Sequence, residues 1–199
     1  MKPRRSASIM ALLFAAILLG GCARASRDEE PNRLCPCEQT AARPVDPVLL
    51  AWLSKARTLH HLADLSEDQG SLDKAVATLE ELVGGTLPAG PPPEAAEVMA
   101  DTYARLAELR ARRGEYERAD KDVESGLRFA PAPTYFRGHL LEVRGLLFAK
   151  ESADLAKAGK PVDVNRAREK ASAASLEAVR IQDEVIKSAL ADAGPATRD

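Results

Sequence analysis

The residues ADTYARLAELRARRGEYERADKDVESGLRFAP, at positions 100–131, decide the fold of this chain. Apolar side chains recur every three or four positions on both sides of Gly114, which predicts two helices joined by a tight turn. Gly114 can adopt the left-handed backbone that a short turn requires, and Pro131 cannot continue the second helix. The two apolar stripes comprise Tyr103, Leu106, Ala107 and Leu109, then Tyr116, Ala119, Val123 and Leu127. One such hairpin cannot bury its own apolar face, so it needs neighbours of the same kind.

The order of residue types in this hairpin resembles a tetratricopeptide repeat. The positions that carry the family pattern hold a large aromatic, a leucine, a small residue, a turn glycine, a second aromatic, an alanine and a closing proline, namely Tyr103, Leu106, Ala107, Gly114, Tyr116, Ala119 and Pro131. The resemblance implies a right-handed stack of two-helix units. It also implies a concave groove, lined by the first helix of each unit, that receives a segment of another protein.

A weaker copy of the pattern precedes this hairpin. Asp46 predicts an N-terminal cap, and Pro47 suits the first position of a helix. The expected stripes are Val48, Leu49, Trp52, Leu53, Ala56, Leu59, Leu62 and Ala63, then Leu72, Ala75, Leu79, Leu82 and Val83. Gly70 precedes Gly114 by 44 residues, whereas the family period is about 34. The excess is the loop 84–93, which its glycines and prolines exclude from a helix; we interpret it as a spacer, with a small binding element as the alternative.

Residues after Pro131 predict a third, longer pair. Apolar residues and Gly145 favour a helix over residues 134–158, and Gly159 marks the break. Asp163 is expected to cap a long final helix over residues 163–193. Its apolar positions are Val164, Ala167, Ala171, Ala174, Leu176, Val179, Ile181, Val185, Ile186 and Leu190. The expected fold is therefore all-α: a short right-handed α-solenoid of about three repeat-like hairpins over residues 47–193, ending in a long helix, with residues 194–199 as a disordered tail.

The first residues have the order of a processing signal. Lys2, Arg4 and Arg5 form a basic head, and residues 9–19 form an apolar run that is too short to span a bilayer. The sequence Leu-Gly-Gly-Cys ends this segment at Cys22. This order resembles a bacterial lipoprotein signal with its lipobox. The alternatives are an ordinary secretory peptide with a chance cysteine and an uncleaved anchor.

The lipobox resemblance implies a site of lipidation. Residues 1–21 would be removed, and Cys22 would carry diacylglycerol and acyl chains such as palmitate, which together hold a protein stably on a membrane. Ala23 stands where an aspartate would resemble a signal for retention in the inner membrane. We therefore expect the periplasmic face of the outer membrane rather than the inner membrane.

Residues 22–46 are expected to form the lipidated cysteine and a flexible tether, because they are polar, contain proline and lack an apolar stripe. Cys35 and Cys37 lie within it, and two thiolates so close in sequence suggest a metal or redox site. The chain has no second cysteine pair of this kind, and its three histidines lie elsewhere. We therefore favour an oxidised pair or intermolecular disulfides, and expect no bound metal or cofactor.

The family resemblance also assigns residues to the groove. Those carried over are Arg57, His60, Asp64, Glu67 and Asp68 from the first pair, Asp101, Ala104, Glu108 and Arg112 from the second, and His139, Glu142, Leu146 and Lys150 from the third. His60 and Asp64 stand where some family members hold a carboxylate terminus with Lys and Asn, so that clamp is absent. The acidic first pair favours a partner segment rich in Lys or Arg; the alternative is that these charges only solvate an exposed helix face.

Composition narrows the function further. Hydrophobic residues make up 45% of the chain but aromatic residues only 4%, which is typical of one helical domain with an aliphatic core. The net charge is −2, and removal of the three basic residues in the signal leaves 25 basic and 30 acidic residues, or −5. Nucleic acid is therefore not an expected partner.

Catalytic signatures are weak. Asp64 lies four residues after His60 and could accept its proton, but the chain lacks a nucleophile elbow, a phosphate-binding loop and a zinc-protease motif. We expect neither an enzyme nor a small-molecule site. The sequence favours a membrane-anchored scaffold that binds a periplasmic or envelope protein in the groove. The alternative is a structural component that self-associates, or docks onto a larger assembly, through the helix predicted over 163–193.

Overall fold

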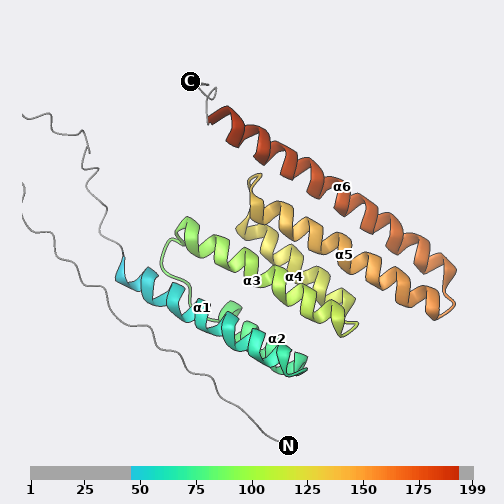
Figure 1. Ribbon diagram of the computed structural model, residues 1–199, viewed down its shortest axis with the longest axis horizontal. Helices are drawn as coiled ribbons and strands as arrows, with labels where there is room; N and C mark the ends of the chain where they lie inside the picture. Colours follow the sequence, from blue (N-terminus) through green and yellow to red (C-terminus); the bar gives the residue numbers. More distant parts are fainter. Residues whose placement is uncertain (1–45, 193–199) are drawn as a thin grey trace, which may run out of the picture. The chain divides into compact units, whose positions relative to one another are not determined.

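The computed structural model describes residues 46–192 of the chain (Figure 1). The predicted signal peptide, the lipidation site Cys22, the pair Cys35 and Cys37, and the tail 194–199 all lie outside the described residues. So does the tether, except for its last residue, Asp46.

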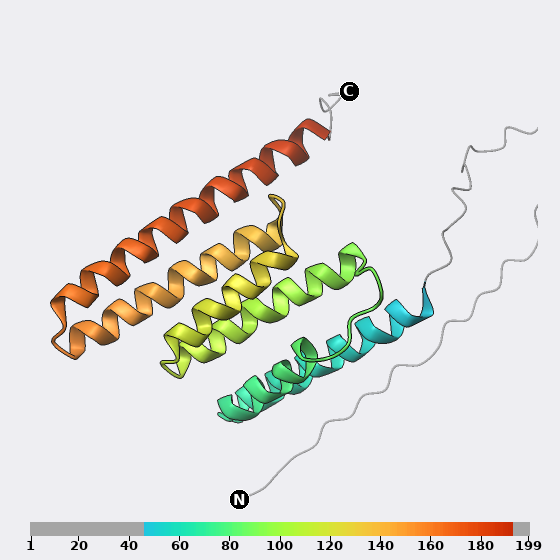
Figure 2. The ribbon, with the colours of Figure 1, turned by 180° about the vertical axis from the view of Figure 1, so that it is seen from behind.

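The described part of the chain is all-α and contains no strand, which confirms the predicted fold class. Its helices are α1 (Pro47–Asp68), α2 (Leu72–Val83), α3 (Pro93–Arg112), α4 (Tyr116–Phe129), α5 (Tyr135–Lys157) and α6 (Pro161–Asp192). They pair in chain order as three antiparallel hairpins, α1 with α2, α3 with α4, and α5 with α6 (Figure 2).

Each hairpin is covered by the next one. Helix α3 packs against both α1 and α2, and α5 packs against both α3 and α4. The first helices of the pairs therefore pack against one another in series, whereas the described parts of α2 and α4 meet through an ion pair of their side chains, Glu80 with Arg118 at 3.5 Å. Each hairpin thus buries its apolar face against a neighbouring hairpin, as the sequence predicted.

Most helix ends lie where the sequence predicts them. The Asp46 carboxylate accepts a hydrogen bond from the backbone amide of Val48 at 2.8 Å, which caps α1 as expected. Gly70 and Gly114 have φ angles of 74° and 78°, in the left-handed region that glycine tolerates. The exception is α6, which begins at Pro161 and not after Asp163, because proline suits the first turn of a helix and the acidic residue then complements its N-terminus.

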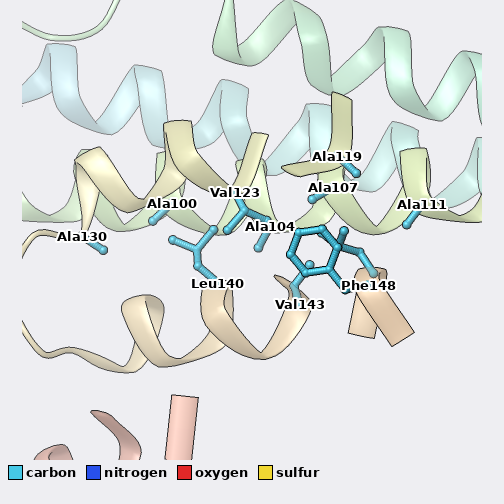
Figure 3. Close-up of a cluster of buried hydrophobic side chains, with 11 residues drawn as sticks. Ala100, Ala104, Ala107, Ala111, Ala119, Val123, Ala130, Leu140, Val143 and Phe148 are labelled. Carbon is cyan, nitrogen blue, oxygen red and sulfur yellow. The ribbon is translucent and has the colours of Figure 1, made fainter. Parts of the chain in front are cut away.

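The core between the second and third hairpins is aliphatic, with a single phenylalanine (Figure 3). It comprises Ala100, Ala104, Ala107 and Ala111 of α3, Ala119 and Val123 of α4, and Leu140, Val143, Leu147 and Phe148 of α5, with Ala130 at the edge. The alanines let the backbones approach closely, while the larger side chains of α5 fill the space between them. A separate cluster joins the first two hairpins through Ala63, Ala75, Val76, Leu79, Leu106 and Leu109.

Some predicted apolar stripes are broader than the buried faces. Val48 and Leu62 of α1 are exposed, and so are four apolar residues of the last helix: Leu176, Val179, Ile186 and Leu190. These residues are exposed because α1 and α6 are the outermost helices of the described chain, and each has neighbours on one side only. Within residues 46–192, no helix is both long enough and apolar enough to cross a membrane.

Candidate protein-binding face

Several of the residues predicted to line a groove do lie near one another, on α1, α3 and α5, and their centre is Arg105. The Arg105 guanidinium of α3 pairs with Glu67 of α1 and lies 3.5 Å from the carboxylate of Asp64. It also contacts Glu108 of its own helix at 3.2 Å. Glu67 receives a second cation, Arg112 of α3. We call the surface formed by these residues, together with the exposed Leu146 and Lys150 of α5, the first-helix face.

This network changes the electrostatics of the first-helix face. Partial burial by itself would lower the pKa of Arg105, but the hydrogen bond that Arg105 donates to Glu108 and the charge of Glu67 outweigh it, so the pKa lies above its ordinary value. Arg105 is therefore a permanent cation among three carboxylates. The acidic side chains that were expected to select a basic partner are largely compensated by this arginine and by Arg112.

His60 is held by a buried threonine. Its Nε2 atom lies 2.8 Å from the Oγ1 atom of Thr102, and the Thr102 hydroxyl donates its proton to the Val98 carbonyl at 2.7 Å. Because a hydroxyl has one proton, the Thr102 oxygen must accept from His60, which assigns the imidazole proton to Nε2. The His60–Asp64 pair considered from the sequence is not formed, since Asp64 faces Arg105 instead.

A depression of about 240 Å³ opens between α3 and α5 on the first-helix face. Ala111, Val143 and Leu147 contribute buried, apolar surface to it, and Leu146 stands beside them with 61% of its surface exposed. The charged residues that line it are Arg105, Glu108, Arg112 and Lys150. The depression therefore offers an apolar surface within a rim of three cations and one anion.

The other predicted groove residues are less closely grouped. His139 lies partly exposed on α5, 3.7 Å from the carboxylate of Glu142 and stacked on the ring of Tyr135 at a centroid distance of 6.0 Å. Asp101 is partly exposed, and Asp68 is exposed at the end of α1. Arg57 lies in a surface hollow lined only by residues of α1.

Ala104 was predicted to face the groove, and that prediction is wrong. It is fully buried in the cluster between α3, α4 and α5 (Figure 3). The family resemblance assigned Ala104 to the same face of the helix as the partly exposed residue Glu108. In this chain α3 is the central helix and packs against four others, so part of that face is buried. So wide a contact surface leaves only a narrow strip of α3 exposed.

Two arginines that organise this part of the chain, Arg105 and Arg110, were not predicted from the sequence. Arg105 could have been found from its spacing to Glu108, since residues three apart on a helix are neighbours. Arg110 is buried and pairs with Asp122 of α4 and Glu80 of α2. These partners lie 12 residues after it and 30 residues before it, so no local pattern points to them.

A larger hollow of about 420 Å³ lies between α4, α5 and α6. Glu117, Asp120 and Glu151 line it together with Arg166 and Lys170, and the Lys170 ammonium sits 4.8 Å from the centre of the Phe148 ring. Asp163 lines it as well, so side chains of both charge signs surround this hollow. Nowhere within the described residues do three or more histidine, cysteine, aspartate or glutamate side chains gather as metal ligands would.

Comparison with known proteins adds no assignment: no family model, no curated protein and no solved structure matches this chain.

Proposed function

We propose that this protein is a membrane-anchored scaffold that binds a segment of a periplasmic or envelope protein on its first-helix face. The observation that supports this most directly is the depression between α3 and α5, where the exposed Leu146 stands beside buried apolar surface. An exposed leucine in an apolar hollow with a polar rim is typical of a protein-binding site. The proposed anchor is the lipid on Cys22, at the periplasmic face of the outer membrane, and the proposed activity needs neither catalysis nor a cofactor.

The charges around the depression favour a particular kind of segment. Arg105 is already engaged by three carboxylates, so the cations of the rim that a partner can meet are Arg112 and Lys150, and an apolar side chain next to an Asp or Glu fits them better than a basic segment does. Lys150 lies 3.3 Å from Asp154 and Arg112 pairs with Glu67, but both cations keep more than two-fifths of their side chains exposed. Rim charges of this kind steer association and set specificity more than they add affinity.

Photocrosslinking in the native envelope tests this proposal. A photoreactive side chain at Glu142, which is exposed and lies one helical turn before Leu146, should capture a discrete partner. The same group at Lys121, an exposed position of α4, is the matched control and should not. Combining the probe at position 142 with Leu146→Asp should abolish the adduct, because a carboxylate then enters the apolar hollow.

Two outcomes would count against a binding role for the first-helix face. One is equal capture at positions 142 and 121, which would indicate contact without selection. The other is an adduct at position 142 that persists in the Leu146→Asp variant, since the hollow would then contribute nothing to recognition. A salt titration adds the charge test, because capture that depends on Arg112 and Lys150 should fall as ionic strength rises.

A further inference from the structure

Helix α6 carries two apolar stripes, and only one of them is covered. The buried stripe faces α5 and comprises Val164, Ala167, Ala174, Ala178 and Ile181. The second comprises Leu176, Val179, Ile186 and Leu190, which are 69%, 54%, 55% and 69% exposed. These four residues lie at the first and fourth positions of a heptad, with Asp183 at the remaining position between Val179 and Ile186. We call this second set the outer stripe of α6.

No part of the described chain covers the outer stripe. Helix α5 is the only helix that α6 contacts within residues 46–192. Gly138, near the start of α5, lies against Ile181 and Gln182 of α6. Because the two helices are antiparallel and α6 continues to Asp192, its last turns extend beyond the start of α5 (Figures 1 and 2).

We propose that the outer stripe is covered by the same stripe of a second copy of this chain, running antiparallel. The reason is its symmetry about Asp183: Leu176 and Leu190 lie seven residues to either side, and Val179 and Ile186 lie four and three residues to either side. With Asp183 on a twofold axis, Leu176 of each copy meets Leu190 of the other. Val179 likewise meets Ile186, so the same patch on both copies is self-complementary, as an isologous contact requires.

The charges near the axis fit this arrangement. Two Asp183 carboxylates would face one another, but Arg180 and Lys187 lie within one turn of them on both copies. Arg180 pairs with Glu177 and Glu184 of its own helix, at 2.7 and 3.5 Å. Lys187 makes no ion pair within the described chain and lies within reach of Asp183 of the second copy.

The contact is small. A single helix pair over about 21 Å lies below the size of a permanent interface, so the dimer is weak and depends on concentration. It uses α6 alone and does not rest on binding at the first-helix face, whose residues lie on α1, α3 and α5. Each of the two proposals can therefore fail without the other.

Disulfide trapping tests the register. In the full chain with Cys22, Cys35 and Cys37 replaced by serine, Asp183→Cys should cross-link to itself on mild oxidation. Leu176→Cys should not cross-link alone, but should do so when mixed with Leu190→Cys. The control is Glu124→Cys, on an exposed position of α4, which should stay monomeric. Efficient self-linking of Leu176→Cys would overturn the antiparallel register, and an absence of cross-links at all three stripe positions would overturn the dimer.

Sedimentation equilibrium of the full chain tests the energetics. Leu176→Lys with Ile186→Lys should abolish the concentration-dependent rise in mass. Val162→Lys is the control: it also replaces an exposed apolar residue of α6 by lysine, but at a 78% exposed position outside the stripe, and it should leave that rise unchanged. Asp183→Leu should lower the dissociation constant by about tenfold or more, because it replaces two facing carboxylates at the axis with apolar contacts. Circular dichroism confirms that each variant is folded; a wild-type chain that stays monomeric, or no effect of Asp183→Leu, refutes the proposal.

Discussion

The buried ion pair between α3 and α4 makes the sharpest test of how this fold is held together. Arg110 pairs with Asp122, and their side chains are only 9% and 10% exposed. A second contact of Arg110 reaches Glu80 of α2, so one guanidinium joins three helices. Burial raises the pKa of Asp122 above its ordinary value, even though the hydrogen bond and charge of Arg110 act in the opposite direction. Burial therefore disfavours the ionised form of Asp122, and the paired Arg110 reduces that destabilisation.

Arg110→Met removes the cation and keeps a side chain of similar reach. The Asp122 carboxylate is then buried without a partner, and breaking a buried pair in this way costs about 3–5 kcal/mol. For a domain of this size, that loss corresponds to a fall of roughly 6–20 °C in Tm. The matched control is Arg110→Met with Asp122→Leu, which removes both charges and should return stability to within about 1 kcal/mol of the wild type, or above it. Glu80 is 41% exposed and keeps Arg118 at 3.5 Å in both variants.

Urea unfolding at several pH values completes the assay. The pKa of Asp122 in the folded state lies above its unfolded value of about 3.9, so the folded chain binds more protons between these two values. Stability contributed by this group therefore rises as the pH falls through the folded pKa, and the deficit of Arg110→Met should shrink on acidification from neutral pH. If the single and double variants were destabilised equally at pH 7, packing of the arginine stem would be what matters, and the reasoning from charge would be refuted.

Three further changes probe the glycines and the contact between α4 and α5. Gly126→Ala should cost about 1–3 kcal/mol in urea unfolding, because the added methyl would meet a Leu140 methyl at 2.6 Å; a stabilised variant would show that α5 can move away. Gly114→Ala has open space around its Cβ but a φ of 78°, so a cost of about 1–2 kcal/mol should come from the backbone alone, and no loss would mean that the turn rearranges. Tyr116→Phe removes the hydroxyl that donates to Asp154; the hydrogen bond from Tyr116 is the largest of the effects that lower the pKa of Asp154, so that pKa should rise in an NMR titration. Because a depressed pKa stabilises the fold above the unfolded value near 3.9, Tyr116→Phe should also lose less stability than the wild type as the pH falls through the acid range, and an unchanged Asp154 titration would contradict the assigned donor.

Much of the fold follows from local chemistry in the sequence. Gly70 and Gly114 set the turns because few other residues tolerate a left-handed backbone, and Asp46 and Pro47 start α1 for equally local reasons. The helical period of the apolar residues then predicted all six helices, although α3 begins at Pro93, seven residues before the stretch in which the pattern was found. The candidate site was harder to predict, because family register alone does not tell an exposed helix position from a buried one, as Ala104 shows.

By itself, the sequence determined that this protein is all-α and where each helix turns, because helix period, capping and glycine turns act within a few residues of one another. Only the tertiary structure decided which apolar residues are buried and which acids are compensated. Arg105 meets Glu67 across 38 residues, and Arg110 meets Glu80 across 30. Leu190 is exposed although it shares the apolar character of the core, because α6 is the last helix and its outer side has no neighbour within the described chain. Burial and charge compensation depend on which residues are neighbours in space. Residues far apart in the sequence become neighbours only when the hairpins pack against one another.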